Sequence, residues 1–400
     1  NSCGAAYIGG VEDEYGALWS ELGISPVPLP PERNAFLWGN QWMVGVEGDN
    51  TKPIYKEFKR FMAEAKPIWD KLPDEMEPEK LAAADLLKLD NVLMSTCMKG
   101  YSPQFMSLMD SFLKSSLNAG VNQISALGAY GLMLDLVSTT HVFKGGNPAI
   151  ARALASKIDL SGSNRVIKKC FVWKVEVKEG GASVVYSTGD GASHRVDCKH
   201  VIMATSPLVA SRQLVHIPDE IKASLMSFRF GSYMVANICM KQKLFNGPYD
   251  CFAGAPYTFS DITVAETPYM KTDTYKPSMG SVLTVYHPYE AGTAGRTTLF
   301  VGDKQKLAAS VVSQLDKITP GLEKAVEEVV LTRWGHALAI IGPGYFSRLG
   351  KLQSLPETAS YSLAHSSVWG WPAAESAIRG GGIAAARALK SSAGVSVIKG

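Results

Sequence analysis

Helical and strand-like patterns alternate in long blocks along this chain, and that alternation limits the folds it can adopt. Residues 51–140 repeat apolar side chains at helical spacing, beginning with Ile54 and Phe58. From about residue 141 short apolar strands replace the helices. Since 400 residues exceed what one hydrophobic core usually serves, we expect two or three domains or one large interleaved one, and the mixture of helices and strands predicts an α/β fold with an α+β part.

Turn residues and periodicity also predict individual elements. Helices are expected at 12–23, 51–71, 79–95, 103–136, 149–158, 304–317 and 372–389, the last interrupted by glycines 380–382. Strands are expected at 171–177, 182–187, 201–204, 233–240, 281–287, 297–301 and 330–334, with a hairpin over 36–44 that turns at Gly39 and Asn40.

The charge balance argues against nucleic acid as a partner. Forty basic residues stand against 37 acidic ones, and a pI of 8.4 is too mild for a basic binding surface. No run of 18 apolar residues and no leader is present, so we expect a soluble protein without a membrane span. Six cysteines without a Cys-x-x-Cys pair fit a reducing compartment, and we expect the cytoplasm.

Several chemistries lack the residues they need. The seven histidines are dispersed without a His-Glu-x-x-His pattern, so no metal site is expected, and no Gly-x-Ser-x-Gly elbow points to a serine hydrolase. The helical block is rich in methionine, which either fills the core or forms the wall of an apolar substrate pocket. These methionines are Met94, Met98, Met106, Met109 and Met133.

The stretch 364–379 carries the most information about a ligand. Pro372 stands where a helix begins, and the alanines that follow are small. The first N–H groups of a helix lack intrahelical partners and favour negative charge, so an electron-rich group can approach Ala373 and Ala374 closely. Tight helix packing alone would also explain these small residues.

Taken together, five stretches resemble the flavin-containing amine oxidase superfamily, which includes amino acid oxidases, protoporphyrinogen oxidases and carotenoid desaturases. The stretches follow the family's order. The first is 4–10 together with the helix that ends at 21–23, and the second is 145–148. The third joins 170–177 and 201–207, the fourth joins 333–334 and 343–344, and the fifth is 371–385. The last resembles the family's terminal motif at Glu375, Ala377, Gly381, Ala384 and Ala385. The resemblance spans most of the chain.

The resemblance implies a Rossmann-like FAD-binding domain over 1–45, 141–215 and 331–400, interleaved with a substrate domain over 46–140 and 216–330. FAD is the implied cofactor. Its implied contacts are Gly4, Ala5, Ala6, Tyr7, Cys170, Trp334, His365, Ser366, Trp371, Ala373, Ala374 and Ala377. Trp334, His336 and Trp369 are the implied catalytic residues, and His336 either acts as a base, orients the substrate or is structural.

The chain departs from the family's pattern in three ways. The opening Gly-x-Gly-x-x-Gly motif is absent, so we expect that segment to precede this sequence or to lie on another chain. The position of the family's lysine near the flavin is Val235, and Lys241 is a doubtful substitute. The two aromatic residues that commonly flank the amine align near Ala337 and on Ala373.

The expected function is FAD-dependent oxidation of a small amine or amino acid, with hydride transfer to the flavin and reoxidation by oxygen or another acceptor. Two alternatives stay open: dehydrogenation of a C–C bond in an apolar substrate, and a non-catalytic accessory subunit with the flavin fold. The expected partners are a small-molecule substrate and either a second copy of the chain or a second chain that carries the missing segment.

Overall fold

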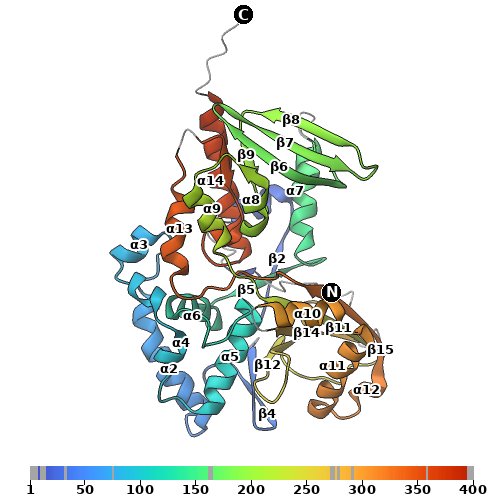
Figure 1. Ribbon diagram of the computed structural model, residues 1–400. Helices are drawn as coiled ribbons and strands as arrows, with labels where there is room; N and C mark the ends of the chain where they lie inside the picture. The colour runs from blue at the N-terminus through green and yellow to red at the C-terminus, as the bar shows by residue number, and fades with distance from the viewer. Residues whose placement is uncertain are drawn as a thin grey trace, which may run out of the picture. The chain divides into compact units, whose positions relative to one another are not determined.

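The computed structural model divides the chain into two interleaved units, each built from three segments (Figure 1). It describes residues 8–9, 15–30, 34–73, 76–160, 165–270, 275–276, 280–289, 292–356 and 359–393. The first unit comprises Asn1–Leu72, Asn91–Leu154 and Arg229–Pro343. The second comprises Pro73–Asp90, Ala155–Phe228 and Gly344–Gly400.

A seven-stranded sheet in the order β15-β11-β14-β13-β12-β3-β4 organises the first unit. Its neighbouring strands are antiparallel except β12 and β3, which run parallel. The strands are β3 (Asn34–Trp38), β4 (Gln41–Val44), β11 (Ser232–Met240), β12 (Asp250–Phe252), β13 (Asp261–Val264), β14 (Ser281–Tyr289) and β15 (Val326–Trp334). Since side chains alternate between the faces of a sheet, the two faces have different compositions.

One face of this sheet is apolar and packs against helices. Met234, Ala236 and Ile238 of β11 share a buried cluster with Val311 and Leu315 of α11. Three helices contribute to that cluster: α10 (Thr293–Val301), α11 (Lys304–Ile318) and α12 (Leu322–Ala325). The other face of the sheet contacts other elements of the first unit.

The helical block packs aromatic rings against part of that second face. Phe252 of β12 lies 5.5 Å from Phe36 of β3 and 5.1 Å from Phe112 of α5 between ring centroids, and Phe36 lies 4.8 Å from Phe58 of α2. The block contains α2 (Pro53–Trp69), α4 (Met94–Cys97), α5 (Pro103–Leu117) and α6 (Ala126–Met133). Four of its methionines, Met94, Met98, Met109 and Met133, are fully buried. Core filling explains their burial without a substrate.

A small sheet completes the first unit. It has the order β1-β5-β2 and consists of β1 (Ile8–Gly9), β2 (Pro26–Pro28) and β5 (Thr140–Phe143). Helix α1 (Gly16–Leu22) ends at Gly23, whose φ of 67° suits glycine, and α7 (Pro148–Leu160) follows β5.

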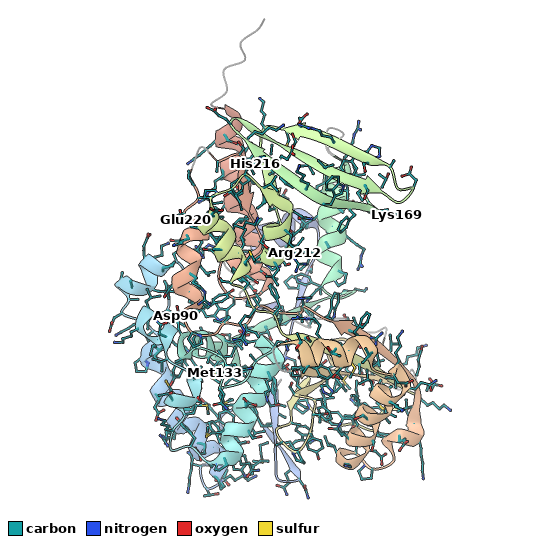
Figure 2. All side chains as sticks on the ribbon, in the orientation of Figure 1. Asp90, Met133, Lys169, Arg212, His216 and Glu220 are labelled. Atoms are coloured by element: carbon teal, nitrogen blue, oxygen red, sulfur yellow. The ribbon has the colours of Figure 1, made fainter. Side chains whose placement is uncertain are left out.

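The second unit contains two sheets. The larger has the order β10-β6-β7-β8, and the smaller pairs β9 and β16 in parallel. The strands are β6 (Cys170–Lys178), β7 (Gly181–Thr188), β8 (Ser193–Cys198), β9 (Val201–Met203), β10 (Leu214–Val215) and β16 (Tyr361–Leu363). Lys169 and His216, labelled in Figure 2, bound this sheet with positive φ angles of 58° and 63°.

Five helices belong to the second unit: α3 (Pro78–Ala83), α8 (Pro207–Gln213), α9 (Asp219–Met226), α13 (Tyr345–Gln353) and α14 (Ala374–Ala393). The buried carboxylate of Asp90, labelled in Figure 2, caps α13. It accepts hydrogen bonds from the backbone N–H groups of Phe346 and Ser347 and from the Ser347 hydroxyl. A segment far away in the sequence thus fixes where α13 begins.

Most predicted elements are confirmed, including the hairpin at Gly39 and the strands around Glu179, but four predictions are wrong at least in part. The region 79–95 forms α3, a 3-10 turn at Leu87–Asn91 and α4, and the region 103–136 divides at Asn118, whose φ of 59° ends α5 before α6 begins. Residues 297–301 belong to helix α10, since Leu299 alone of the run Leu299-Phe300-Val301 is buried and Phe300 is 87% exposed. Such short apolar runs suit helix or strand equally. Helix α14 starts at Ala374 and continues unbroken through glycines 380–382.

Packing explains the first of those glycines. A Cβ at Gly380 would lie 2.2 Å from Cδ1 of Trp369, so only glycine lets the helix approach that ring. Among the described residues, no helix is both long and apolar enough to cross a membrane. Cys97, Cys170, Cys198, Cys239 and Cys251 are free thiols.

Candidate active site

The second face of the seven-stranded sheet carries a row of polar and aromatic side chains. The register places Asp261 of β13 opposite Tyr286 of β14, and Tyr286 opposite Val235 of β11. Val235 is opposite Thr332 of β15. One row across four strands therefore joins a carboxylate, a phenol, a valine and a threonine.

A second carboxylate joins this row. Asp250 of β12 is opposite Thr263, two residues from Asp261 on the same strand, so the two carboxylates are diagonal neighbours on one face. Asp250 is 1% exposed and Asp261 is 3% exposed. The Asp261 carboxyl is hydrogen bonded to Asp250 and to Ser115 of α5.

Burial, followed by the charge of Asp250, raises the pKa of Asp261 well above its usual range. Two buried carboxylates close together oppose each other's ionisation, so Asp261 holds its proton more tightly than an exposed aspartate does. Among the described residues, no lysine, arginine or histidine acts on the Asp261 carboxyl. The pair is a buried acidic site on this face of the sheet.

Three tyrosines surround the acid pair, by which we mean Asp250 and Asp261. Tyr233 donates from its hydroxyl to the Ser115 carbonyl at 3.0 Å, and its ring lies 6.0 Å from that of Tyr286. Burial raises the pKa of Tyr233 and of Tyr249, and the nearby carboxylates add to both effects. Tyrosines that stay neutral and buried can line a pocket without adding charge.

Two of the predicted catalytic residues lie at the end of β15. Trp334 is opposite Tyr233 and is 45% exposed, which is unusual for a tryptophan beside so buried a face. His336 lies in the following turn, exposed, with its ring 6.3 Å from that of Phe230. The exposed indole offers a flat apolar surface for a ring system.

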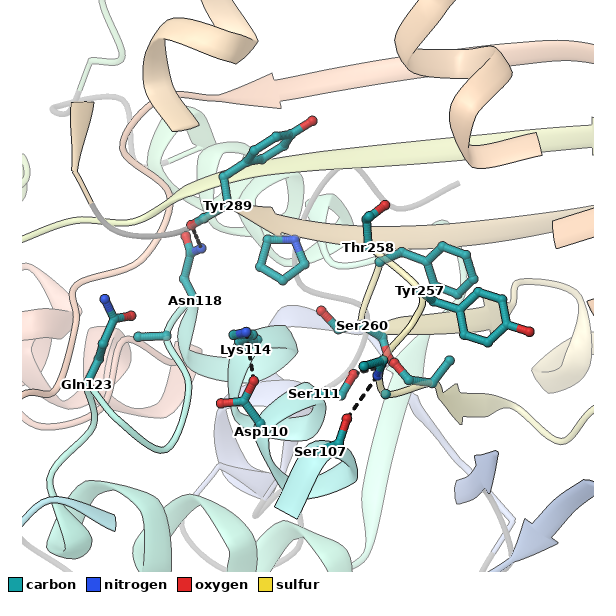
Figure 3. A pocket seen from close by; sticks show the side chains of 16 residues that line it. Ser107, Asp110, Ser111, Lys114, Asn118, Gln123, Tyr257, Thr258, Ser260 and Tyr289 are labelled. Carbon is teal, nitrogen blue, oxygen red and sulfur yellow. Dashed lines mark hydrogen bonds and ion pairs between the residues drawn. The ribbon is translucent and has the colours of Figure 1, made fainter. Parts of the chain in front are cut away.

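A separate cavity of about 200 Å³ lies between α5 and the loop that precedes β13 (Figure 3). Lys114 and Asp110 form an ion pair of 2.7 Å in its wall, so their charges cancel. Ser107 accepts a hydrogen bond from the Ala255 N–H, and this bond fixes the loop against the helix. The lining is polar but has no excess charge.

In the second unit, Trp369, His365 and Ser366 belong to the turn before α14. Trp369 is buried, donates from Nε1 to the Leu363 carbonyl at 2.8 Å and packs on Gly380, so the structure gives it a packing role. The Nδ1 atom of His365 accepts the N–H of Ser367 and caps a short 3-10 helix, η5 (Ser366–Val368). Burial lowers the pKa of His365.

The N-terminus of α14 provides a test for the implied cofactor. The side chains of Ala373 and Ala377 are exposed there, and the first N–H groups of a helix have no intrahelical partners. Gly370 has a φ of 136°, which favours glycine. The Ser367 hydroxyl is fully buried and has no hydrogen-bond partner among the described residues. Small residues, the positive end of a helix dipole and the Ser367 hydroxyl fit an electron-rich group such as part of FAD.

The remaining predicted cofactor residues are scattered. Trp371 packs edge-on against Phe346 with ring centroids 5.4 Å apart, and Ala374 is the first residue of α14. Cys170 opens β6, where its thiol contacts the Lys168 carbonyl at 3.5 Å. Gly4, Ala5, Ala6 and Tyr7 lie outside the described residues.

Sequence reasoning missed the acid pair. Asp250 and Asp261 each begin a strand of only three or four residues, too short for a strong periodic pattern. The usable signal was the alternation of polar and apolar residues in Asp261-Ile262-Thr263-Val264, which marks a strand with one polar face.

Comparison with known proteins agrees with the expected family. A profile described as flavin containing amine oxidoreductase matches residues 17–367. The fold is similar to that of cyclohexylamine oxidase from Brevibacterium oxydans IH-35A, with a TM-score of 0.75, 15% identity, and coverage of 98% of this chain and 87% of that chain.

Putrescine oxidase, whose wild-type structure was solved with putrescine bound, has a similar fold with a TM-score of 0.74 and 16% identity. The alignment covers 96% of this chain and 87% of that chain. No curated protein sequence matches. The family match spans well over half of the chain, and the structure has the fold to go with it. This chain belongs to the flavin containing amine oxidoreductase family and is an FAD-dependent oxidoreductase.

Proposed function

We propose that this chain oxidises a small amine to an imine. The carbon–nitrogen single bond becomes double as the carbon loses a hydride and the nitrogen loses a proton, and water then hydrolyses the imine. FAD, when bound, supplies the two-electron acceptor, and oxygen or another acceptor takes the electrons afterwards.

The observation that carries this proposal is the acidic, tyrosine-lined face of the sheet in the first unit. An ionised carboxylate on this face would attract a cationic substrate, and an apolar substrate would gain nothing from it. Cyclohexylamine oxidase and putrescine oxidase, which share the fold, are named for amines, and this supports the same class of substrate. The burial of four of the five methionines in the core weakens one of the supports for an apolar C–C substrate.

Residues of this face orient the substrate and exclude water. Val235 is apolar where the resemblance places the family's lysine, and it packs in a buried cluster with Tyr233 and Tyr286. Trp334 forms an apolar wall at the edge of the sheet, and we propose that the reacting carbon lies near these two residues. His336, two residues further on, is proposed to orient the substrate at the same end.

We assign FAD binding to the second unit and to the segments expected from the resemblance. Ser366, Ala373, Ala374 and Ala377 would face the cofactor around the first turn of α14. His365, Trp371, Cys170 and residues 4–7 remain proposed contacts, as does the division into FAD-binding and substrate domains. Trp369 is no longer proposed as a catalytic residue, because it is buried in the core.

Anaerobic reduction of the FAD-loaded protein tests the proposed function. We expect primary amines such as butylamine to bleach the visible absorbance of the oxidised flavin, and air to restore it with release of hydrogen peroxide if oxygen is the acceptor. A protein that holds FAD but is bleached by no amine or amino acid would contradict the proposal. Bleaching by an apolar C–C substrate alone would favour the desaturase alternative.

A further inference from the structure

Two arginines tie helix α10 to the strand that ends at the proposed reacting position. Arg333 of β15 donates from Nη1 to the carbonyls of Leu299 at 2.7 Å and Gly302 at 3.4 Å, and its charge at this C-terminal end stabilises the helix. Arg296 lies near the N-terminus of α10, where the helix dipole disfavours a positive charge. The stabilising contacts of Arg296 therefore lie outside the helix.

The guanidinium group of Arg296 joins two strand ends. Its Nε donates to the Gly335 carbonyl, just after β15, at 2.7 Å, and its Nη2 donates to the Phe230 carbonyl, just before β11, at 3.2 Å. Oγ of Ser232 adds a second hydrogen bond to the Gly335 carbonyl at 3.2 Å. The arginine stem packs on this glycine, because a Cβ at Gly335 would lie 3.4 Å from Cγ of Arg296. A planar fork of donors can hold two carbonyls in fixed directions, which a single ammonium group cannot do.

Residues 335–337, here called the His336 turn, follow directly on Trp334. Their backbone is held at both ends, because the first carbonyl accepts the hydrogen bonds just described and the N–H of Ala337 donates to the Gly231 carbonyl at 2.9 Å. Trp334 precedes that first carbonyl by one residue, and His336 follows it by one. The direction of this planar peptide group therefore affects where both side chains lie.

From these contacts we infer that Arg296 is a positioning residue for the oxidation, which holds the His336 turn so that Trp334 and His336 meet the substrate at fixed places. The inference rests on the proposed function, in which those two side chains contact the substrate, and adds a residue that acts through them. Arg296 bonds to backbone carbonyls and does not itself touch the substrate. Because a small misplacement of positioning groups slows a reaction strongly, losing this hold should slow flavin reduction more than it weakens amine binding.

Matched arginine variants separate positioning from the attachment of α10. Arg296→Ala removes the fork, and Arg296→Lys keeps the charge without it. Arg333→Ala is the control, because it also loosens α10 from the sheet but leaves the bonds to the Gly335 carbonyl in place. Melting temperatures check that each variant folds, and both alanine variants should lose only about 2–6 °C.

Hydrogen–deuterium exchange reads the His336 turn without reference to activity. The Ala337 N–H should exchange at least about fivefold faster in Arg296→Ala than in wild type, because its bond to the Gly231 carbonyl opens more often. Free guanidinium ion at a non-denaturing concentration should restore part of the protection, and sodium chloride at equal ionic strength should not. Arg333→Ala should match wild type at this position.

Anaerobic mixing of the FAD-loaded protein with butylamine measures the limiting rate of flavin reduction and the half-saturating amine concentration. We expect Arg296→Ala to lower the rate by about 10- to 100-fold and to change the half-saturating concentration less than about threefold. Arg296→Lys should recover only a small part of the rate, whereas guanidinium ion should raise the rate of Arg296→Ala at least about fivefold. Arg333→Ala should stay within about threefold of wild type.

Equal rates in Arg296→Ala and Arg333→Ala would overturn the inference and leave the proposed function in place, as would unchanged exchange at Ala337. If no amine reduces the flavin of wild type, the proposed function fails. Faster exchange at Ala337 in Arg296→Ala, reversed by guanidinium ion, would then support Arg296 as the residue that positions the His336 turn.

Discussion

Replacing Asp90 with alanine is expected to lower the free energy of unfolding by about 4 kcal/mol. The carboxylate is fully buried, and it accepts the N–H of Phe346 at 3.2 Å, the N–H of Ser347 at 2.9 Å and the Ser347 hydroxyl at 2.8 Å. Alanine leaves two backbone donors unpaired, each costing about 1–3 kcal/mol, and removes a favourable charge at a helix N-terminus.

Loss of the Asp90 cap would also affect residues outside α13. The hydroxyl of Tyr345, the first residue of that helix, donates to the carbonyls of Ser367 at 2.7 Å and Gly370 at 3.1 Å. Those carbonyls belong to the turn that leads into α14. We therefore expect Asp90→Ala also to weaken retention of FAD.

Urea unfolding measures the loss, and hydrogen–deuterium exchange of residues 345–353 locates it. Asp90→Asn should cost about 1–2 kcal/mol, since the amide keeps one acceptor oxygen but turns a donor toward Ser347. Asp85→Asn is the matched control, because Asp85 is exposed and asparagine also adopts the positive φ found at this position. This variant should change the free energy of unfolding by less than about 0.5 kcal/mol. A loss below about 1 kcal/mol in Asp90→Ala, or one equal to the control, would refute the capping argument.

Three further outcomes are expected. The raised pKa of Asp261 means that the folded state holds this carboxyl proton more tightly than the unfolded state does. Wild type should therefore lose stability relative to Asp261→Asn as pH rises above 3.8, the ordinary pKa of an aspartate. Melting temperatures of both proteins from pH 4 to 7 measure this loss. Gly380→Ala should lower the free energy of unfolding by about 1–3 kcal/mol, because the new Cβ clashes with Trp369. Gly382→Ala has no atom within 4 Å of the new Cβ and should raise the free energy of unfolding by up to about 1 kcal/mol. Thermal melts measure both changes. Trp334→Ala should leave the melting temperature nearly unchanged but slow flavin reduction by amines at least about tenfold; an unchanged rate would remove Trp334 from the site.

The sequence was a good guide to the elements but did not point to the acid pair. Apolar spacing predicted α2 and α11 because a helix face is set by residues three and four apart. The acid pair depends on which strands become neighbours, and β11, β13 and β14 are joined by long connections with no local signal. Asp261 and Val235 share a row only through Tyr286, a relation of pairing and not of spacing.

The capping of α13 by Asp90 has a consequence for synthesis of the chain. Asp90 and Ser347 are 257 residues apart. At a translation rate of ~5–20 residues per second, Ser347 is therefore made about 13–50 s after Asp90. The seven-stranded sheet also forms late in synthesis, because its edge strand β15 ends at Trp334. Neither unit can close before its last segment is made, and apolar surface stays exposed until then. Expression should therefore respond strongly to chaperone supply and to growth temperature, and a chain stopped short of β15 should yield neither unit intact.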